Sequence, residues 1–223
     1  MTVASREAEV AQLSLVYGQP LRQRHVLQVS PTTFDWWTVT KPRRTDGEVA
    51  LLIRRCNGSI LLHGKQFYPR GAMRLPTGGI LAQESLVDAA LREALEETGL
   101  LVEVERFLAV VEFEFCCGGL SVPFPSYLFL LRDIGGELRP CDPEEQIAAY
   151  AEVPCIELTY IAASLENLPS EWSDWGAFRA LPHRLAATLL ATELTSPTYP
   201  DTARTTRTVS RVGVLERSRR TGR

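Results

Sequence analysis

The sequence has no long apolar run, little excess charge and no signal-peptide pattern. No hydrophobic stretch approaches the roughly eighteen residues that suggest a membrane-spanning helix. The N-terminal segment MTVASREAEVAQL carries acids where a signal peptide needs a basic and then an apolar region. A formal net charge of −3 gives no general attraction to nucleic acid or to an anionic membrane. These absences favour a cytoplasmic protein.

Cysteines are also few, and their spacing matches no common metal-binding or redox motif. The five residues are odd in number, they form no CxxC motif, and Cys116 and Cys117 are adjacent. Neighbouring cysteines are poorly placed to share a zinc ion. Reduced thiols used as small apolar side chains are therefore preferred over a metal or redox role.

Length and composition predict one substantial domain with appendages. The chain has 223 residues, of which 45% are hydrophobic, as is ordinary for a protein with a real core. Residues 1–20 are expected to form an N-terminal helix or extension, residues 24–195 the main domain, and residues 196–223 an Arg-rich disordered tail. A nucleic-acid-binding arm is an alternative for the tail, but the tail lacks interleaved aromatic residues.

Strands, turns and helices alternate along the main domain. FDWWTVT, within residues 25–40, is rich in aromatic and branched side chains and predicts an extended segment. EVALLI predicts a buried central strand, and the segments before and after CCGG predict a long hairpin. Residues 134–136 predict a loop, and Pro182 predicts a kink or a break in the last helix. Helices are expected at residues 3–17, 85–98, 156–165 and 174–191.

Three glutamates crowd the end of the predicted helix 85–98. Glu93, Glu96 and Glu97 repel one another at these spacings, and acids near a helix C-terminus oppose the helix dipole. Helical periodicity places Glu93 and Glu97 in line with apolar residues, whereas Glu96 borders the solvent side. A solvated helix end explains Glu96 but explains the other two poorly. A compensating cation would turn the cluster into a site, and Mg²⁺ prefers carboxylate oxygens.

The residues around this cluster follow a recognisable pattern. Seven fixed positions stand at the required distances, and a chance match is expected on the order of once in a million chains. The pattern resembles the Nudix box, and the chain is similar to the Nudix hydrolase superfamily. The one soft position is Ala94, where the family more often has a larger aliphatic residue. The fixed positions are Gly78, Glu84, Arg92, Glu93, Glu96, Glu97 and Gly99.

The resemblance implies both a fold and a reaction. The fold is α/β, an α/β/α sandwich around a mixed β-sheet. The reaction is hydrolysis of a pyrophosphate bond in a nucleoside diphosphate linked to another moiety, of the dinucleotide, nucleotide sugar or ADP-ribose type. A nucleoside triphosphate pyrophosphatase that clears damaged nucleotides and a non-catalytic nucleotide sensor are the alternatives. The implied partner is a nucleotide-type small molecule, and a homodimer is compatible with the pattern.

The resemblance also assigns roles to the residues of the box. Carried over by position, Glu93 and Glu97 are the principal ligands of Mg²⁺, with Mn²⁺ as an alternative ion. Glu96 is a further ligand, and the carbonyl of Gly78 completes the shell. Arg92 can reach Glu96 at i+4 and is expected to orient the carboxylates. Glu84 is expected to favour the helix start, with a remote contribution to the site as the alternative.

The general base and the substrate contacts are less strongly specified. Glu144 and Glu145, in the loop DPEEQ, are the candidates for the base, with an exposed acidic turn as the alternative. Arg70 and Arg74, just ahead of the box, are candidates for phosphate contacts, with surface solubility as the alternative. Five aromatic residues could stack on a base, although core packing is the preferred role for each. They are Trp36, Trp37, Phe67, Tyr68 and Phe124.

Overall fold

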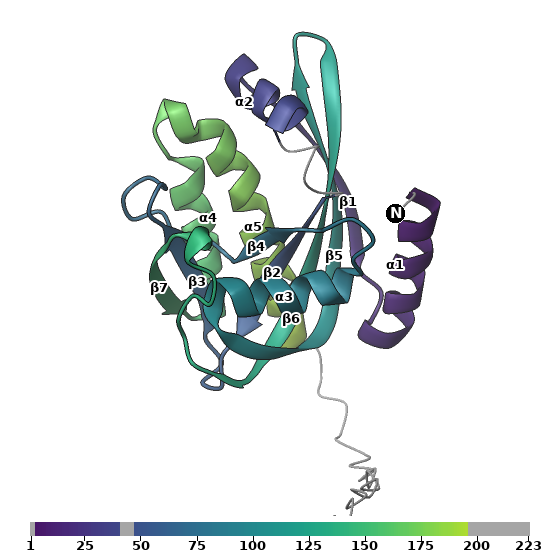
Figure 1. Cartoon of the computed structure of the whole chain (residues 1–223), viewed down its shortest axis with the longest axis vertical. Helices are drawn as coiled ribbons and strands as arrows, with labels where there is room; N and C mark the ends of the chain where they lie inside the picture. Colours follow the sequence, from purple (N-terminus) through teal and green to yellow (C-terminus); the bar gives the residue numbers. More distant parts are fainter. Residues whose placement is uncertain (1–2, 41–46, 196–223) are drawn as a thin grey trace, which may run out of the picture.

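Helices and strands alternate along the residues that the computed structural model describes, 3–40 and 47–195 (Figure 1). The helices are α1 (Val3–Tyr17), α2 (Pro31–Asp35), α3 (Leu86–Thr98), α4 (Leu158–Glu166) and α5 (Ser173–Thr195). The strands are β1 (Leu21–Gln28), β2 (Glu48–Arg54), β3 (Ile60–Lys65), β4 (Thr77–Gly79), β5 (Leu100–Cys117), β6 (Leu120–Gly136) and β7 (Ile147–Val153). Short helical turns are η1 (Trp36–Thr40), η2 (Pro143–Glu145), η3 (Cys155–Glu157) and η4 (Ser170–Trp172).

The strands form one mixed sheet. Its order is β1-β5-β6-β2-β3-β7, and β4 pairs with β2 beside this path. β1 runs parallel to β5 and β2 runs parallel to β6, whereas β5 and β6 form a long antiparallel hairpin. The predicted central strand EVALLI is β2, which lies between β6 and β3. The predicted α/β class with a mixed sheet is confirmed.

Side chains of β2 alternate between two cores on opposite faces of the sheet. Ala50 and Leu52 join the core that contains Phe178 of α5, together with residues of α2 and α4. Leu51 joins the core that contains Leu86 of α3, together with Val10 of α1. Helices therefore cover both faces, with α1 and α3 opposite α5 (Figure 1). This is the expected α/β/α sandwich.

The predicted box helix is α3, and its ends are set by local chemistry. The Ser85 hydroxyl accepts a hydrogen bond from the Asp88 N–H at 3.0 Å and caps the N-terminus. The carboxylate of Glu9 in α1 accepts the Leu86 N–H at 2.6 Å. Gly99 ends the helix at φ 70°, a conformation that glycine adopts without strain. The prediction of a helix over 85–98 is confirmed.

Residues 31–40 are helical, so the prediction of an extended segment is wrong. The Ser30 hydroxyl caps α2 by accepting the Thr33 N–H, and Pro31 takes the first helical position. In the π-helical turn η1, Trp37 stacks on Phe115 with ring centroids 4.2 Å apart. Helix capping and the burial of Trp37 outweigh the extended preference of aromatic and branched residues.

Two further predictions are corrected. Gly135 and Gly136 continue β6 instead of forming a loop, because they pair with Leu101 and Leu100 at the start of β5. A Cβ on Gly136 would lie 2.4 Å from the Gly99 carbonyl oxygen, so the pairing requires glycine. α5 runs through Pro182, so the predicted break does not occur, since buried apolar residues on both sides hold the helix against the sheet. The alternative, a kink at Pro182, stays a prediction.

The predicted Arg-rich tail, residues 196–223, lies outside the described residues. The helices of the described chain all fall short of the length and apolar character needed to cross a membrane.

Candidate active site

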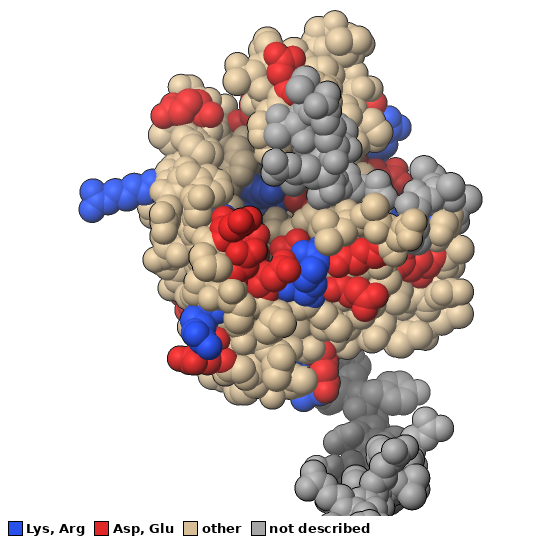
Figure 2. All heavy atoms as spheres, viewed as in Figure 1, with Lys and Arg blue, Asp and Glu red and all other residues tan. Residues whose placement is uncertain are grey.

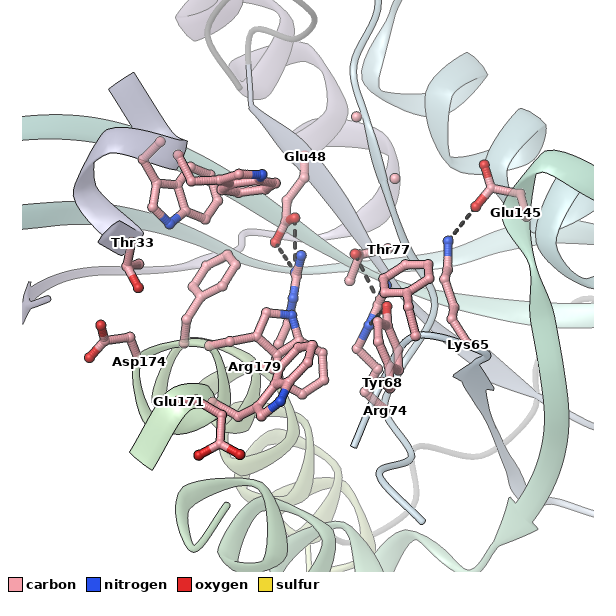
Figure 3. A pocket seen from close by; sticks show the side chains of 18 of the residues that line it. Thr33, Glu48, Lys65, Tyr68, Arg74, Thr77, Glu145, Glu171, Asp174 and Arg179 are labelled. Atoms are coloured by element: carbon pink, nitrogen blue, oxygen red, sulfur yellow. Dashed lines mark hydrogen bonds and ion pairs between the residues drawn. The ribbon is translucent and has the colours of Figure 1, made fainter. Parts of the chain in front are cut away.

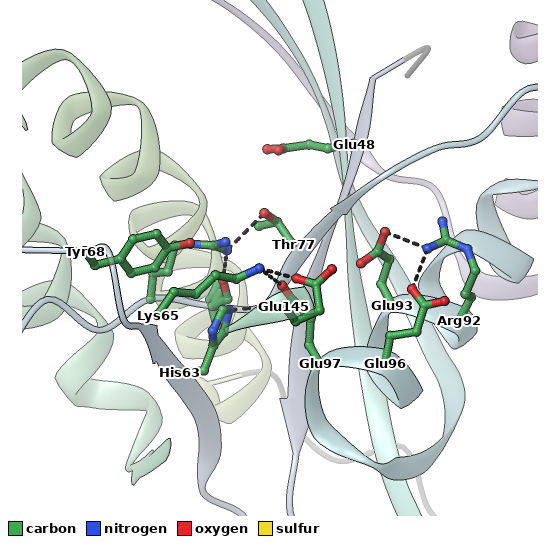
Figure 4. Close-up of polar contacts among 12 residues, drawn as sticks. Glu48, His63, Lys65, Tyr68, Thr77, Arg92, Glu93, Glu96, Glu97 and Glu145 are labelled. Carbon is green, nitrogen blue, oxygen red and sulfur yellow. Dashed lines mark hydrogen bonds and ion pairs between the residues drawn. The ribbon is translucent and has the colours of Figure 1, made fainter. Parts of the chain in front are cut away.

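Arg92 holds three of the four glutamates of the box together. Its Nε and Nη2 donate to the two carboxylate oxygens of Glu84 at 2.7 and 2.8 Å. Its Nη1 donates to Glu93 at 2.7 Å and to Glu96 at 2.9 Å (Figure 4). The hydrogen bond from Arg92 lowers the pKa of Glu84. Glu84, expected to favour the helix start, is thus also the carboxylate that fixes Arg92.

Glu93 is buried against the glycine that opens the box. A Cβ on Gly78 would lie 1.6 Å from Cδ of Glu93, so this packing requires glycine at position 78. Glu93 is only 6% exposed. Burial and then the charge of Glu97 raise the pKa of Glu93 to about 7, although Arg92 opposes the shift. In the metal-free protein this carboxyl group therefore ionises only as the pH rises through about 7, and its ionisation costs free energy.

Glu97 is fully buried between two basic residues of β3. Nζ of Lys65 lies 2.8 Å from Oε1, and Nε2 of His63 lies 3.5 Å from Oε2. The contact with Lys65 is an ion pair without hydrogen-bond alignment, and within the described residues neither oxygen of Glu97 has a hydrogen-bond partner. Burial raises the pKa of Glu97 and lowers the pKa of His63 well below its usual range. His63 is therefore neutral.

Lys65 also bonds to Glu145, which brings the DPEEQ loop to the box (Figure 4). The Cys141 N–H fixes the same loop by donating to the Glu96 carbonyl at 2.9 Å. Of the two candidates for the general base, the structure brings Glu145 to the site. Glu144 is exposed and does not line the cavity described next.

A cavity of about 710 Å³ opens beside these carboxylates. Lys65, Glu93 and Glu145 form part of its wall. Figure 3 shows Lys65 and Glu145 at this side of the cavity. On the face shown in Figure 2, acidic side chains gather around basic ones in front of α3. Of the predicted stacking residues, only Phe124 is missing from the lining, because it is buried in the core. The aromatic lining residues are Trp36, Trp37, Phe67, Tyr68, Trp172, Trp175 and Phe178.

A buried ion pair lies at the back of the cavity. Nη1 of Arg179 in α5 lies 2.9 Å from both carboxylate oxygens of Glu48 in β2 (Figure 3). Burial lowers the pKa of Arg179, and the charge of Glu48 opposes this shift. Within the described chain, Nε of Arg179 has no hydrogen-bond partner. A buried guanidinium with a spare donor therefore lines the cavity.

Arg74, but not Arg70, reaches the cavity. Arg74 is buried and donates to the hydroxyls of Thr77 at 2.9 Å and Tyr68 at 2.7 Å. These bonds fix its guanidinium beside the strand that leads into the box. Arg70 is exposed, and its side chain does not line the cavity. Of the two candidates for phosphate contacts, the structure therefore places only Arg74 at the cavity.

His183 connects α5 to the segment ahead of the box. Its Nε2 accepts the Leu75 N–H at 3.0 Å, and its Nδ1 therefore donates to the Arg179 carbonyl at 2.8 Å. Burial lowers the pKa of His183 to about 3. The ring is neutral with one fixed tautomer, and it ties the last helix to the backbone that precedes Gly78.

Several lining residues were not singled out from the sequence. Lys65 ends the apolar strand ILLHGK, so its only signal is a charge at the end of a buried run. Arg179 and His183 stand four residues apart among buried apolar residues of α5, which is a signal that the sequence contains. Glu48, Trp172 and Trp175 give no comparable signal, because the fold alone brings their segments to the same cavity.

The donor set of the box fits a divalent cation in its chemistry. The unbonded buried oxygens of Glu97, and the cradle of Gly78 around Glu93, are features that a cation would satisfy. These carboxylates nevertheless already pair with basic side chains of the protein: Glu93 and Glu96 with Arg92, and Glu97 with Lys65. Among residues 3–40 and 47–195, no three acidic, histidine or cysteine side chains come together as a ready metal site.

The fold and the carboxylate cluster define a class of protein, and comparison with known families agrees. The NUDIX domain model matches residues 43–175, which is more than half of the chain. The chain therefore belongs to the Nudix hydrolase superfamily. A Mycobacterium tuberculosis protein that carries the name mutator protein MutT4 is 33% identical over 113 residues, or 51% of this chain. The match spans only 41% of that relative's length.

Solved structures with a similar arrangement include several enzymes. An ADP-ribose pyrophosphatase from Streptococcus suis 89-1591 is 23% identical with a TM-score of 0.40, over 63% of this chain and 88% of that one. A UDP-X diphosphatase is 19% identical with a TM-score of 0.44, over 86% of this chain and 73% of that one. The MutT protein of Methanosarcina mazei Go1 is 20% identical with a TM-score of 0.38, over 62% and 90%.

Proposed function

We propose that the chain is a divalent-cation-dependent pyrophosphohydrolase that acts on a nucleoside diphosphate linked to another moiety. The observation that supports this most is that acidic, basic and aromatic side chains line the same cavity. Glu93 of the Nudix box, with Lys65 and Glu145, lines one part of the cavity, and arginines with aromatic rings line another part. One substrate could then place a pyrophosphate near the acids and a planar ring among the aromatics.

The proposed ligands of the cation are those expected from the sequence. Glu93 and Glu97 are the principal ligands, Glu96 and the Gly78 carbonyl are further ligands, and Mg²⁺ is the expected ion, with Mn²⁺ as its substitute. When bound, the cation would neutralise the charge of the pyrophosphate and polarise the attacked phosphorus. Arg92 holds Glu93 and Glu96 in position for this role.

Glu145 is the proposed general base. Its side chain is 25% exposed and lines the cavity, so a water molecule can reach it. A carboxylate in this position can accept the proton of the attacking water. Lys65, which bonds to Glu145, holds the carboxylate towards the box.

The aromatic rings are the proposed contacts of the linked nucleoside. Trp36 and Phe67 are partly exposed at the cavity and can offer a ring face to a base. A volume of about 710 Å³ lies in the usual range for sites of small organic ligands. It exceeds what a bare phosphate needs, which favours a substrate with a sizeable second moiety.

A nucleoside triphosphate pyrophosphatase is the second candidate. It is favoured by the relative from Mycobacterium tuberculosis, which is named a mutator protein. The same carboxylates would serve this reaction, because both substrates contain a phosphoanhydride bond.

A substrate panel tests the proposal. ADP-ribose, NADH, nucleotide sugars and nucleoside triphosphates would each be incubated with the full chain and Mg²⁺, and release of nucleoside monophosphate or phosphate measured. We expect turnover of at least one, and a loss on the order of a hundredfold in the folded variant Glu97→Gln. Glu166→Gln, which removes an exposed carboxylate paired with Arg184, is the matched control. Tight binding of one compound without turnover of any would favour a nucleotide sensor instead.

A further inference from the structure

Lys65 lies where two acids of the proposed site meet. It is the last residue of β3, at a point where the register between β3 and β7 shifts. Its Nζ lies 2.8 Å from Oε1 of Glu97 and also bonds to Oε2 of Glu145 (Figure 4). One ammonium group thus neutralises two carboxylates that come from separate elements, α3 and η2.

Most buried ion pairs have a purely structural role, but two features set this one apart. Lys65 lines the cavity together with Glu145 and Glu93, so its charge lies at the site and not behind it. Among residues 3–40 and 47–195, the oxygens of Glu97 also have no hydrogen bond of good geometry, so the lysine balances their charge through an ion pair at 2.8 Å and not through an aligned hydrogen bond. An ammonium on a four-carbon stem can leave such a contact by rotation of its own side chain.

We propose that Lys65 is the built-in counter-ion of Glu97 and Glu145 in the metal-free protein, and that a divalent cation must displace it to bind these carboxylates. The inference rests on the proposed function, because it assumes that the box binds such a cation. It adds that the site is not an open set of acids. The protein carries an internal competitor that sets the affinity for the metal.

Lys65 stabilises the fold of the metal-free protein. Without it, the buried Glu97 would lie near Glu93 and Glu145 with no cation in contact, which is a strongly unfavourable state. Lys65 stabilises the fold when metal is absent and weakens metal binding by the same interaction. Removal of Lys65 should therefore have opposite effects on the two properties, whereas a purely structural lysine would weaken both.

The test compares the affinity of the full-length chain for Mn²⁺ alone, without substrate, by electron paramagnetic resonance of free Mn²⁺. Lys65→Met keeps the length of the side chain and removes its charge. We expect this variant to bind Mn²⁺ more tightly by on the order of tenfold, and to unfold at a lower temperature in the presence of a chelator. Arg132→Met removes an exposed cation paired with Glu103 and should leave the affinity unchanged.

Lys65→Arg decides the case in which Lys65→Met does not fold even with Mn²⁺. An arginine can hold both carboxylates at least as firmly as the lysine does. The Lys65→Arg variant should therefore bind Mn²⁺ no more tightly than the original chain. Equal or weaker Mn²⁺ binding by folded Lys65→Met would overturn the inference, as would tighter binding by Lys65→Arg where only that variant folds. If neither the original chain nor Lys65→Met binds Mn²⁺, the proposed metal-dependent function itself fails.

Discussion

Replacement of Glu93 by glutamine should stabilise the metal-free protein at alkaline pH. The pKa of Glu93 is raised from 4.5 to about 7, chiefly by burial. The folded protein then keeps a proton on Glu93 between these pH values while the unfolded chain loses it, so stability falls as pH rises from 4.5 to 7. A shift of this size corresponds to about 3 kcal/mol at pH 8. Glutamine resembles the protonated acid and escapes this loss.

The prediction can be checked by chemical and thermal unfolding in the presence of a chelator. Glu93→Gln should match the original chain near pH 4.5 and exceed it by about 3 kcal/mol at pH 8, or about 6–12 °C in Tm. Mn²⁺ at pH 8 should narrow the gap, because it stabilises the original chain more than the variant. Glu103→Gln, an exposed acid paired with Arg132, should change stability by no more than about 0.5 kcal/mol. An original chain that is as stable as Glu93→Gln at pH 8 would show that Glu93 is not held at a cost.

Three further outcomes are expected. Glu145→Gln should lower kcat at least about tenfold while Glu144→Gln leaves it unchanged, because only Glu145 lines the cavity; equal rates for both variants and the original chain would exclude Glu145 as the base. Arg179→Met should lower the free energy of unfolding by about 3–5 kcal/mol, because it leaves Glu48 buried without its cation. The double variant with Glu48→Gln should recover most of this loss. Denaturant titrations that show no recovery would contradict a stabilising ion pair between Arg179 and Glu48. Trp36→Ala should raise KM about tenfold with little change in kcat, since the partly exposed ring lines the cavity; an unchanged KM would exclude this ring as a substrate contact.

The box could be predicted because its signals are local. The cap Ser85, the stop Gly99 and the three glutamates all lie within one short segment, and periodicity alone places Glu93 and Glu97 on the buried side. The sheet was also readable, because the hairpin β5–β6 and the strand β2 have long apolar patterns. Local chemistry and local periodicity thus determine both the elements and the acids of the site.

The cavity could not be predicted because its residues meet only through the fold. Glu48 and Arg179 are 131 positions apart, and Lys65 meets Glu145 across 80 positions. The sequence around one residue of each pair gives no indication of its partner. The wrong prediction of an extended segment around Trp37 has a related reason. The helical turn that contains Trp37 is stabilised by its stack on Phe115, which no local preference encodes.

The supports of the site extend beyond the part of the chain that the family model matches, residues 43–175. Before it, Arg6 of α1 donates to the Glu84 carbonyl at 3.3 Å, and Glu9 accepts the first N–H of α3. After it, Arg179 lines the cavity and His183 fixes the backbone ahead of the box. The box supplies carboxylates that many sequences could supply. The position of those carboxylates, and the wall that a substrate would contact, depend on α1 and on the rest of α5. Glu9 and Arg6 thus connect α1, which the sequence predicts to be an N-terminal extension, to the start of the helix that carries the proposed ligands.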